Sequence, residues 1–137
     1  MTASRRAVSV AEVMTSRVRT AEPAASVHDL WQLLREEHCH HVPIVEGGRP
    51  VGIVSTRDLV RVARRHGAAK LSEGLDGGET ASDVMSRALE TIGPDEPVER
   101  AIERIGQGDI HALVVVDDDG GLAGIVTHHD LLHFLFS

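Results

Sequence analysis

Residues 52–59 of this chain read Gly-Ile-Val-Ser-Thr-Arg-Asp-Leu, and residues 124–131 read Gly-Ile-Val-Thr-His-His-Asp-Leu. In each copy an apolar run is followed by Ser or Thr, and an Asp comes three residues later. The run is typical of a short strand, and the Ser/Thr-x-x-Asp pattern is typical of a helix N-terminus. The sequence therefore predicts the same strand-to-helix junction twice. We name residues 52–59 the first junction and residues 124–131 the second junction.

The similarity between the two halves extends beyond the junctions. The earlier matches lie 71 residues apart, and one inserted residue in the acidic turn at residues 117–121 moves the offset to 72. The earlier matches are Val13–Thr15 with Val84–Ser86, Thr20 with Thr91, Pro23 with Pro94, Val27 with Val98, His40 with His111 and Val45 with Val116. Each copy is too small to bury a good core alone, so we expect the two to pack as one pseudo-symmetric body.

Local patterns predict the same order of elements in each copy. Ser9 and Glu12 form a capping box for a short helix, and a strand is expected at residues 17–20. Ser26 caps a longer helix. The core stripe expected on that helix is Val27, Leu30, Trp31 and Leu34.

Two β-hairpins and the repeat boundaries complete this outline. We expect hairpins over residues 41–54 and 113–126, each followed by a helix. We place the first repeat at residues 8–66, a Gly-rich polar linker at 67–79 and the second repeat at 80–136.

Composition narrows the functional classes. The chain has 137 residues, of which 42% are hydrophobic, enough for one compact core or two half-cores. No apolar run approaches the roughly 20 residues that cross a bilayer, and the first six residues lack the apolar stretch of a secretory signal. The single cysteine, Cys39, fits a reducing compartment. We therefore expect a cytoplasmic protein with no membrane partner.

Charge is distributed unevenly along the chain. The net charge of −7 argues against a nucleic-acid partner, which would need a basic surface. Residues 1–71 contain 11 basic and 7 acidic side chains, whereas residues 72–137 contain 3 basic and 14 acidic ones. The first half is therefore basic and the second half strongly acidic.

The junctions have the chemistry of a ligand site. The Ser or Thr stands beside unpaired backbone N–H groups at the positive end of a helix dipole, where an anion is favoured. The Asp three residues later is a strong acceptor for a ribose diol, and the glycine lets a group approach the backbone closely. The alternative is an ordinary N-cap with a first-turn acid. The repetition at equivalent positions favours the ligand site.

The ordered set of motifs resembles a known family. Paired Val-Met-Thr/Ser turns, a Pro-x-x-x-Val helix start, a His-x-Val-Pro-Ile-Val strand and Gly-Ile-Val-Ser/Thr-x-x-Asp are similar to a tandem pair of cystathionine β-synthase (CBS) domains, the Bateman module. The resemblance runs from about Val8 to the C-terminus. It implies an α+β fold of two pseudo-symmetric β-α-β-β-α repeats packed sheet against sheet. It also implies clefts between the repeats that bind AMP, ADP, ATP or S-adenosylmethionine.

The resemblance assigns roles to individual residues. They are ribose contacts for Asp58 and Asp130, ribose or phosphate contacts for Ser55 and Thr127, adenine contacts for Ile53 and Ile125, and phosphate contacts for Arg57 and His129. The basic pair that often precedes the second strand of the family maps onto His40-His41 and onto His111-Ala112. Ala112 departs from that pattern. Because Asp117–Asp119 also lie nearby in sequence, we expect the Asp58 site to bind nucleotide more tightly than the Asp130 site.

These features predict a stand-alone regulatory, energy-sensing module rather than an enzyme, since no nucleophile with a neighbouring base and no phosphate-binding P-loop stands out. An adenine nucleotide or S-adenosylmethionine would be its regulatory ligand, no cofactor would be required, and an unidentified effector protein would read its state. A homodimer is expected, because residues 131–136 expose apolar side chains. One alternative is a structural dimerisation module with vestigial sites. A metal-dependent protein using His38–His41 is a third hypothesis.

Overall fold

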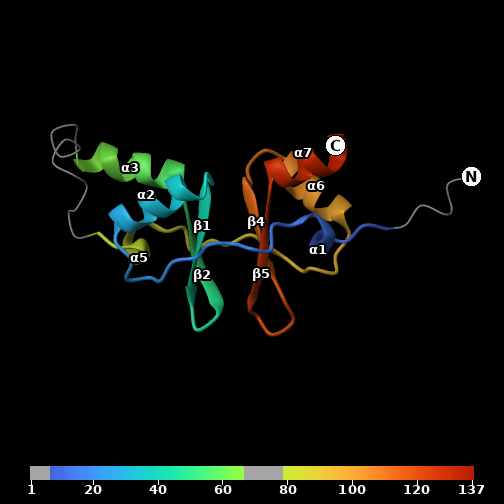
Figure 1. Cartoon of the computed structure of the whole chain (residues 1–137), viewed down its shortest axis with the longest axis horizontal. Helices are drawn as coiled ribbons and strands as arrows, with labels where there is room; N and C mark the ends of the chain where they lie inside the picture. The colour runs from blue at the N-terminus through green and yellow to red at the C-terminus, as the bar shows by residue number, and fades with distance from the viewer. Residues whose placement is uncertain (1–6, 67–78) are drawn as a thin grey trace, which may run out of the picture. The chain divides into compact units, whose positions relative to one another are not determined.

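The structure, a computed structural model, describes residues 7–66 and 79–137, and most of the linker expected at 67–79 lies outside them (Figure 1). The fold is mixed α and β, which confirms the expected class. The elements are α1 (Val10–Val13), α2 (Val27–Glu36), β1 (His41–Glu46), β2 (Arg49–Ser55), α3 (Thr56–His66), α5 (Ala81–Val84), β3 (Thr91–Ile92), α6 (Val98–Gly106), β4 (Ala112–Val116), β5 (Leu122–Thr127) and α7 (His128–Phe136).

The described chain divides into two compact units, and each contains one junction. The first unit consists of residues 18–66 and 79–89, and the second unit consists of residues 7–17 and 90–137. Each unit therefore takes its opening helical turn from the other repeat. The turn α1 belongs to the unit of β4 and β5, and α5 belongs to the unit of β1 and β2.

The first unit is a β-hairpin covered by helices. Strands β1 and β2 pair antiparallel from His41 opposite Ser55 to Glu46 opposite Arg49. The turn between them contains two glycines with positive φ, a conformation that side chains with a Cβ rarely adopt. Its core consists of Val27, Leu30, Leu34, Val42, Ile44, Val54, Leu59 and Ala81.

Two local expectations for the first unit were wrong. Residues 17–20 form no strand; the extended pairing lies one residue later, where Ala21 makes a parallel bridge to Ile44. Trp31 is 46% exposed rather than part of the core. The buried stripe of α2 is formed by Val27, Leu30 and Leu34, and a residue next to Leu30 projects to the side of that stripe.

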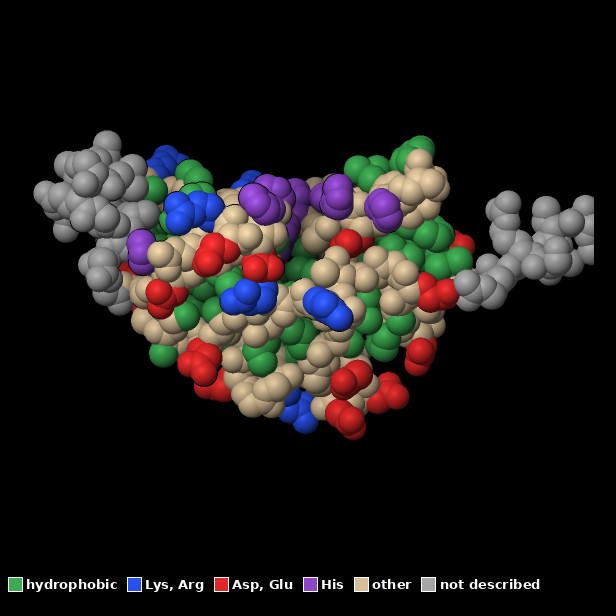
Figure 2. Space-filling model, in the orientation of Figure 1, with side chains coloured by type: hydrophobic (Ala, Val, Ile, Leu, Met, Phe, Trp, Pro, Cys, Tyr) green, Lys and Arg blue, Asp and Glu red, His purple; other side chains and the backbone are tan. Residues whose placement is uncertain are grey.

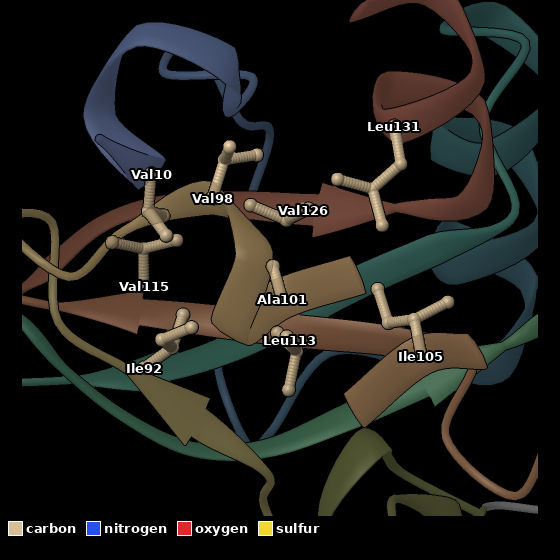
Figure 3. Close-up of a cluster of buried hydrophobic side chains, with 9 residues drawn as sticks. All are labelled: Val10, Ile92, Val98, Ala101, Ile105, Leu113, Val115, Val126 and Leu131. Carbon is tan, nitrogen blue, oxygen red and sulfur yellow. The ribbon is translucent and has the colours of Figure 1, made fainter. Parts of the chain in front are cut away.

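The second unit has a three-stranded sheet. Strand β3 pairs parallel with β4, and β4 pairs antiparallel with β5. Figure 3 shows the buried cluster of this unit, which gathers side chains from α1, α6, α7 and the sheet. Its members are Val10, Ile92, Val98, Ala101, Ile105, Leu113, Val115, Val126 and Leu131. Val10 comes from the opening turn of the first repeat and is completely buried.

Equivalent contacts hold the two opening turns. In the second unit the backbone N–H of Val10 donates to the Glu96 carbonyl at 2.8 Å, and in the first unit the N–H of Ala81 donates to the Ala25 carbonyl at 2.8 Å. Ser9 with Glu12 forms the expected capping box. The turn α5 has its own box, Thr80 with Asp83, in which Thr80 lies 71 residues after Ser9. Within residues 7–66 and 79–137, no helix has the length and apolarity needed to cross a membrane.

Candidate functional site

At the first junction, Asp58 closes the start of α3. Its Oδ2 accepts hydrogen bonds from the backbone N–H and the Oγ of Ser55, at 2.7 and 3.0 Å, and the Ser55 Oγ accepts the N–H of Asp58 at 3.2 Å. Its Oδ1 accepts a bond from Arg61 Nη1 at 3.0 Å, and the Asp58 side chain is only 13% exposed. The carboxylate is therefore held in one orientation by the cap and by a guanidinium one turn along the helix.

The second junction has the same capping bonds, but a different group bonds to the other oxygen of its aspartate. Asp130 Oδ2 accepts bonds from the Thr127 N–H at 2.9 Å and the Thr127 Oγ1 at 3.2 Å. Its Oδ1 accepts a bond from the hydroxyl of Thr15 at 2.8 Å. Sequence reasoning missed Thr15 as a site residue. The available signal was its place in the repeated Val-Met-Thr/Ser turn.

The capping bonds leave some acceptor capacity on each carboxylate. An ionised carboxylate offers about four lone-pair positions, and three are used at each junction by the bonds just described. One hydroxyl of a ribose diol can therefore bond to Oδ1 directly. A second hydroxyl requires Oδ1 to exchange Arg61 or Thr15 for the ligand. The cap and a ribose contact are thus compatible at the same aspartate.

Histidines expected near the sites lie beside the junctions. His41 is the cross-strand partner of Ser55, and the His40 carbonyl accepts the N–H of Thr56 at 3.0 Å. In the second unit Ala112 is the partner of Thr127, at the position that departs from the family pattern. There the rings of His111 and His128 lie with their centroids 5.7 Å apart.

The junction glycines accommodate methionines of the same unit. An added Cβ at Gly52 would lie 2.3 Å from Met85 Sδ, and one at Gly124 would lie 2.7 Å from Met14 Sδ. The residue after each methionine pairs with the strand: Ile53 exchanges backbone hydrogen bonds with Ser86, and Ile125 does so with Thr15. The close approach expected at these glycines is therefore made by the chain itself.

Exposure differs among the remaining candidate residues. Ile53 is half-buried, whereas Ile125 is only 6% exposed. Arg57 and His129 occupy the second position of α3 and α7 and are both exposed.

The acidic turn at residues 117–121 lies at the far end of the β4–β5 hairpin from the second junction. Leu122 is paired beside the turn, and Thr127 lies five residues further along β5. At about 3.4 Å per residue the separation is roughly 17 Å, about twice the Debye length at physiological ionic strength. Asp117 also accepts the N–H groups of Asp119 and Gly121 within that turn. Repulsion by this turn is therefore a weak reason for the two sites to differ.

The His38–His41 segment does not assemble a metal centre in the described part of the chain. No three His, Cys, Asp or Glu side chains there converge on one point. Burial raises the pKa of the Cys39 thiol above its ordinary value of 9.0, so the metal-binding thiolate is disfavoured at neutral pH.

Each junction joins the last strand of an antiparallel hairpin to a helix, and both copies fall within regions that one family profile matches. The CBS domain profile matches residues 10–65 and again residues 81–137, so the chain belongs to the CBS domain family. It is 32% identical to the CBS domain-containing protein YhcV of Bacillus subtilis, over 90% of this chain and 82% of that protein. It is 36% identical to a homoserine O-acetyltransferase of Methanococcoides burtonii over 90% of this chain. The chain spans 23% of that enzyme and 62% of a Methanopyrus kandleri protein to which it is also 36% identical.

Solved structures of CBS pairs have the same fold. CBSX2 of Arabidopsis thaliana superposes with a TM-score of 0.81 at 26% identity, over 95% of each chain. A complex of CBSX2 with AMP has a TM-score of 0.78, covering 93% of this chain and 95% of that one. The CBS pair of protein MJ0100, solved with 5′-methylthioadenosine and S-adenosylmethionine, has a TM-score of 0.79 at 25% identity, over 95% and 97%. The resemblance seen in the sequence is thereby confirmed.

Proposed function

We infer that this chain is a regulatory module that binds an adenosine-type ligand at its two junctions. The observation that carries this inference is the repeated capped aspartate. Asp58 and Asp130 are each held rigidly by three hydrogen bonds and keep acceptor capacity on Oδ1. Support comes from CBSX2, which was crystallised with AMP, and from MJ0100, which was crystallised with two adenosyl compounds. The site roles of Ser55, Thr127, Ile53, Ile125, Arg57, His129, His40, His41 and His111 remain part of this proposal.

The proposed mechanism is differential binding. A ribose diol that bonds to Oδ1 through both hydroxyls at the second junction replaces the Thr15 hydroxyl, which follows the opening turn of the chain. The ligand thus favours a state in which that contact is exchanged, and a protein that distinguishes the two states reads the occupancy. We place that effector outside these 137 residues and propose that the module works in the cytoplasm without catalysing a reaction.

A homodimer is the second part of the proposal. Helix α7 exposes four large apolar side chains, with Phe136 81% and Leu132 53% exposed. In the first unit Val60, at the position equivalent to Leu132, is 70% exposed. Because the matched helices of both repeats present apolar side chains, a second copy of the chain offers a surface of the same kind. The basic first half and acidic second half favour a head-to-tail arrangement.

This apolar surface also supports the runner-up function, a structural dimerisation module without ligands. Native mass spectrometry of gently purified protein separates the two, since a co-purifying adenosyl compound supports regulation. A ligand-free dimer that also fails to bind AMP, adenosine and S-adenosylmethionine in calorimetry would favour the structural module. A monomer at micromolar concentration in sedimentation would overturn the dimer.

Asp58→Asn tests the site itself. The amide keeps the shape and one acceptor but loses the charge, so ligand affinity should fall by about 1.5–3 kcal/mol at the first junction. The matched control is Asp29→Asn, a first-turn acid of α2 outside both junctions. An Asp58 variant that binds as well as the wild type would show that the ribose contacts lie elsewhere.

A further inference from the structure

The two junctions differ in permanent positive charge. In the register of the repeat, Arg57 corresponds to His129, and Arg61, one turn later, corresponds to His133. Residues 49–66 contain five arginines, whereas residues 122–137 contain no lysine or arginine. Figure 2 shows this difference as blue side chains over α3 and as purple and green side chains over α7.

The group that bonds to Oδ1 of the aspartate is also charged at one junction and neutral at the other. Arg61 Nη1 lies 3.0 Å from Asp58 Oδ1, so a guanidinium offsets the charge of that carboxylate. Asp130 Oδ1 has the neutral hydroxyl of Thr15 in the same role, at 2.8 Å. His133 does not replace Arg61, because its Nδ1 lies 3.0 Å from the hydroxyl of Ser137.

The charge at each junction bears on which ligand it accepts. A phosphate monoester carries a charge of about −1.5 to −2 at neutral pH, and guanidinium groups bind it through charge-assisted, often bidentate bonds. Arg57 and Arg61 provide that charge on α3. A phosphate brought to Asp130 would instead meet a carboxylate that no arginine of α7 offsets.

We propose that the two junctions select different classes of adenosine ligand. The first junction takes an adenosine ligand that carries phosphate, and the second takes one without phosphate, such as a nucleoside or thionucleoside. This assignment rests on the proposed function, because it requires that both aspartates hold ribose. It adds that the module responds to two compounds at once rather than to one compound twice.

Calorimetric titration of AMP and of adenosine into the full chain tests the assignment at neutral pH and physiological ionic strength. Asp130→Asn leaves the first junction intact and should retain AMP binding. Asp58→Asn leaves the second junction intact and should weaken AMP binding by about tenfold to a hundredfold while still binding adenosine. AMP binding that follows Asp130 instead would overturn the assignment.

Exchanging the charged residues gives a test that leaves both aspartates in place. The double variant R57H/R61H should lower the ratio of AMP to adenosine affinity at the first junction by about tenfold to a hundredfold, the range for a bond to a charged group. The reciprocal H129R/H133R should raise that ratio at the second junction. The control R64H makes a single Arg-to-His change at an exposed position further along α3 and should alter the ratio by no more than about twofold.

The outcomes separate this inference from the function on which it rests. A wild-type chain that binds neither AMP nor adenosine contradicts the proposed function. Binding of both with a ratio that neither exchange alters leaves the function intact and overturns the assignment. AMP binding at the second junction that Arg17→Ala abolishes would also overturn it, since Arg17, two residues after Thr15, would then supply the cation.

Discussion

The two junctions have one backbone geometry and different polar surroundings. Residues identical in both copies are those with a steric or bonding role: the glycine that faces a methionine, the apolar pair in the strand, the capping Asp and the buried Leu. The residues that differ are half-buried or exposed, and Arg57 and His129 are exposed in both copies. The comparison teaches that the buried and hydrogen-bonded positions maintain the backbone geometry of the junction, whereas substitutions at its exposed positions leave that geometry unchanged.

The largest effect should come from adding a methyl group at the junction glycines. A Cβ at Gly124 would lie 2.7 Å from both Met14 Sδ and the Thr15 carbonyl oxygen, whereas the three nearest atoms at Gly52 all belong to the Met85 side chain. A backbone oxygen has less freedom to move aside than a methionine side chain. Gly124→Ala should therefore lower the free energy of unfolding by about 2–3 kcal/mol and Gly52→Ala by about 1 kcal/mol.

Urea unfolding followed by circular dichroism measures both losses. Met85→Ala should restore most of the stability lost in Gly52→Ala, whereas Met14→Ala should restore little of that lost in Gly124→Ala. Equal losses and equal rescue in the two pairs of variants would show that the added Cβ meets an equally movable neighbour at Gly52 and at Gly124.

A somewhat smaller effect is expected from the core position that the opening turns share. Val10 and Ala81 are equivalent in the repeat and both completely buried, each in the core of the other repeat's unit. Val10→Ala removes two methyl groups from the second unit and should cost about 2 kcal/mol of unfolding free energy. Glu103→Ala, at an exposed position of α6 in the same unit, is the control and should change stability by less than about 0.5 kcal/mol. A negligible loss for Val10→Ala would show that α1 is not part of that core.

The contact between Thr15 and Asp130 should have a modest effect. Thr15→Val removes a hydrogen bond to a carboxylate at an exposed position, so we expect a loss of about 0.5–1 kcal/mol in urea unfolding. The equivalent Ser86→Ala should be near neutral, because the Ser86 hydroxyl makes no hydrogen bond within the part of the chain that the structure describes. In a double-mutant cycle with Asp130→Asn, additive losses would contradict a direct interaction.

The smallest effect concerns the pH dependence of the cap at the start of α5. The backbone N–H of Thr80, followed by its hydroxyl, lowers the pKa of Asp83 below the ordinary value of 3.8. The unfolded chain therefore binds this proton at higher pH than the folded chain does, and the stabilisation is lost as pH falls through the lowered pKa. The stability difference between wild type and Asp83→Asn should be present above about pH 4 and vanish in stronger acid. A difference that stays constant with pH would rule out this carboxylate as its source.

The sequence alone determined the repeated architecture, because the features that specify it act over a few residues. The short apolar strand runs, the Gly-rich turns and the caps at Ser9 and Ser26 are local, and the recurrence of these motifs at a nearly fixed offset indicated two copies of one unit. The same local reasoning misjudged Trp31, since a helical period places a residue near the core side without saying how far the neighbouring elements extend over it.

The tertiary structure decided which distant segments complete each junction. Thr15 and Asp130 are 115 residues apart in sequence, and their hydrogen bond exists because α1 is buried in the unit that contains α7 rather than in the unit that contains α3. A short helical turn carries no local signal for its partner; the burial of Val10 among α6, α7 and the sheet settles the choice. The difference between a guanidinium on Asp58 and a hydroxyl on Asp130 follows from that packing as much as from the residues themselves.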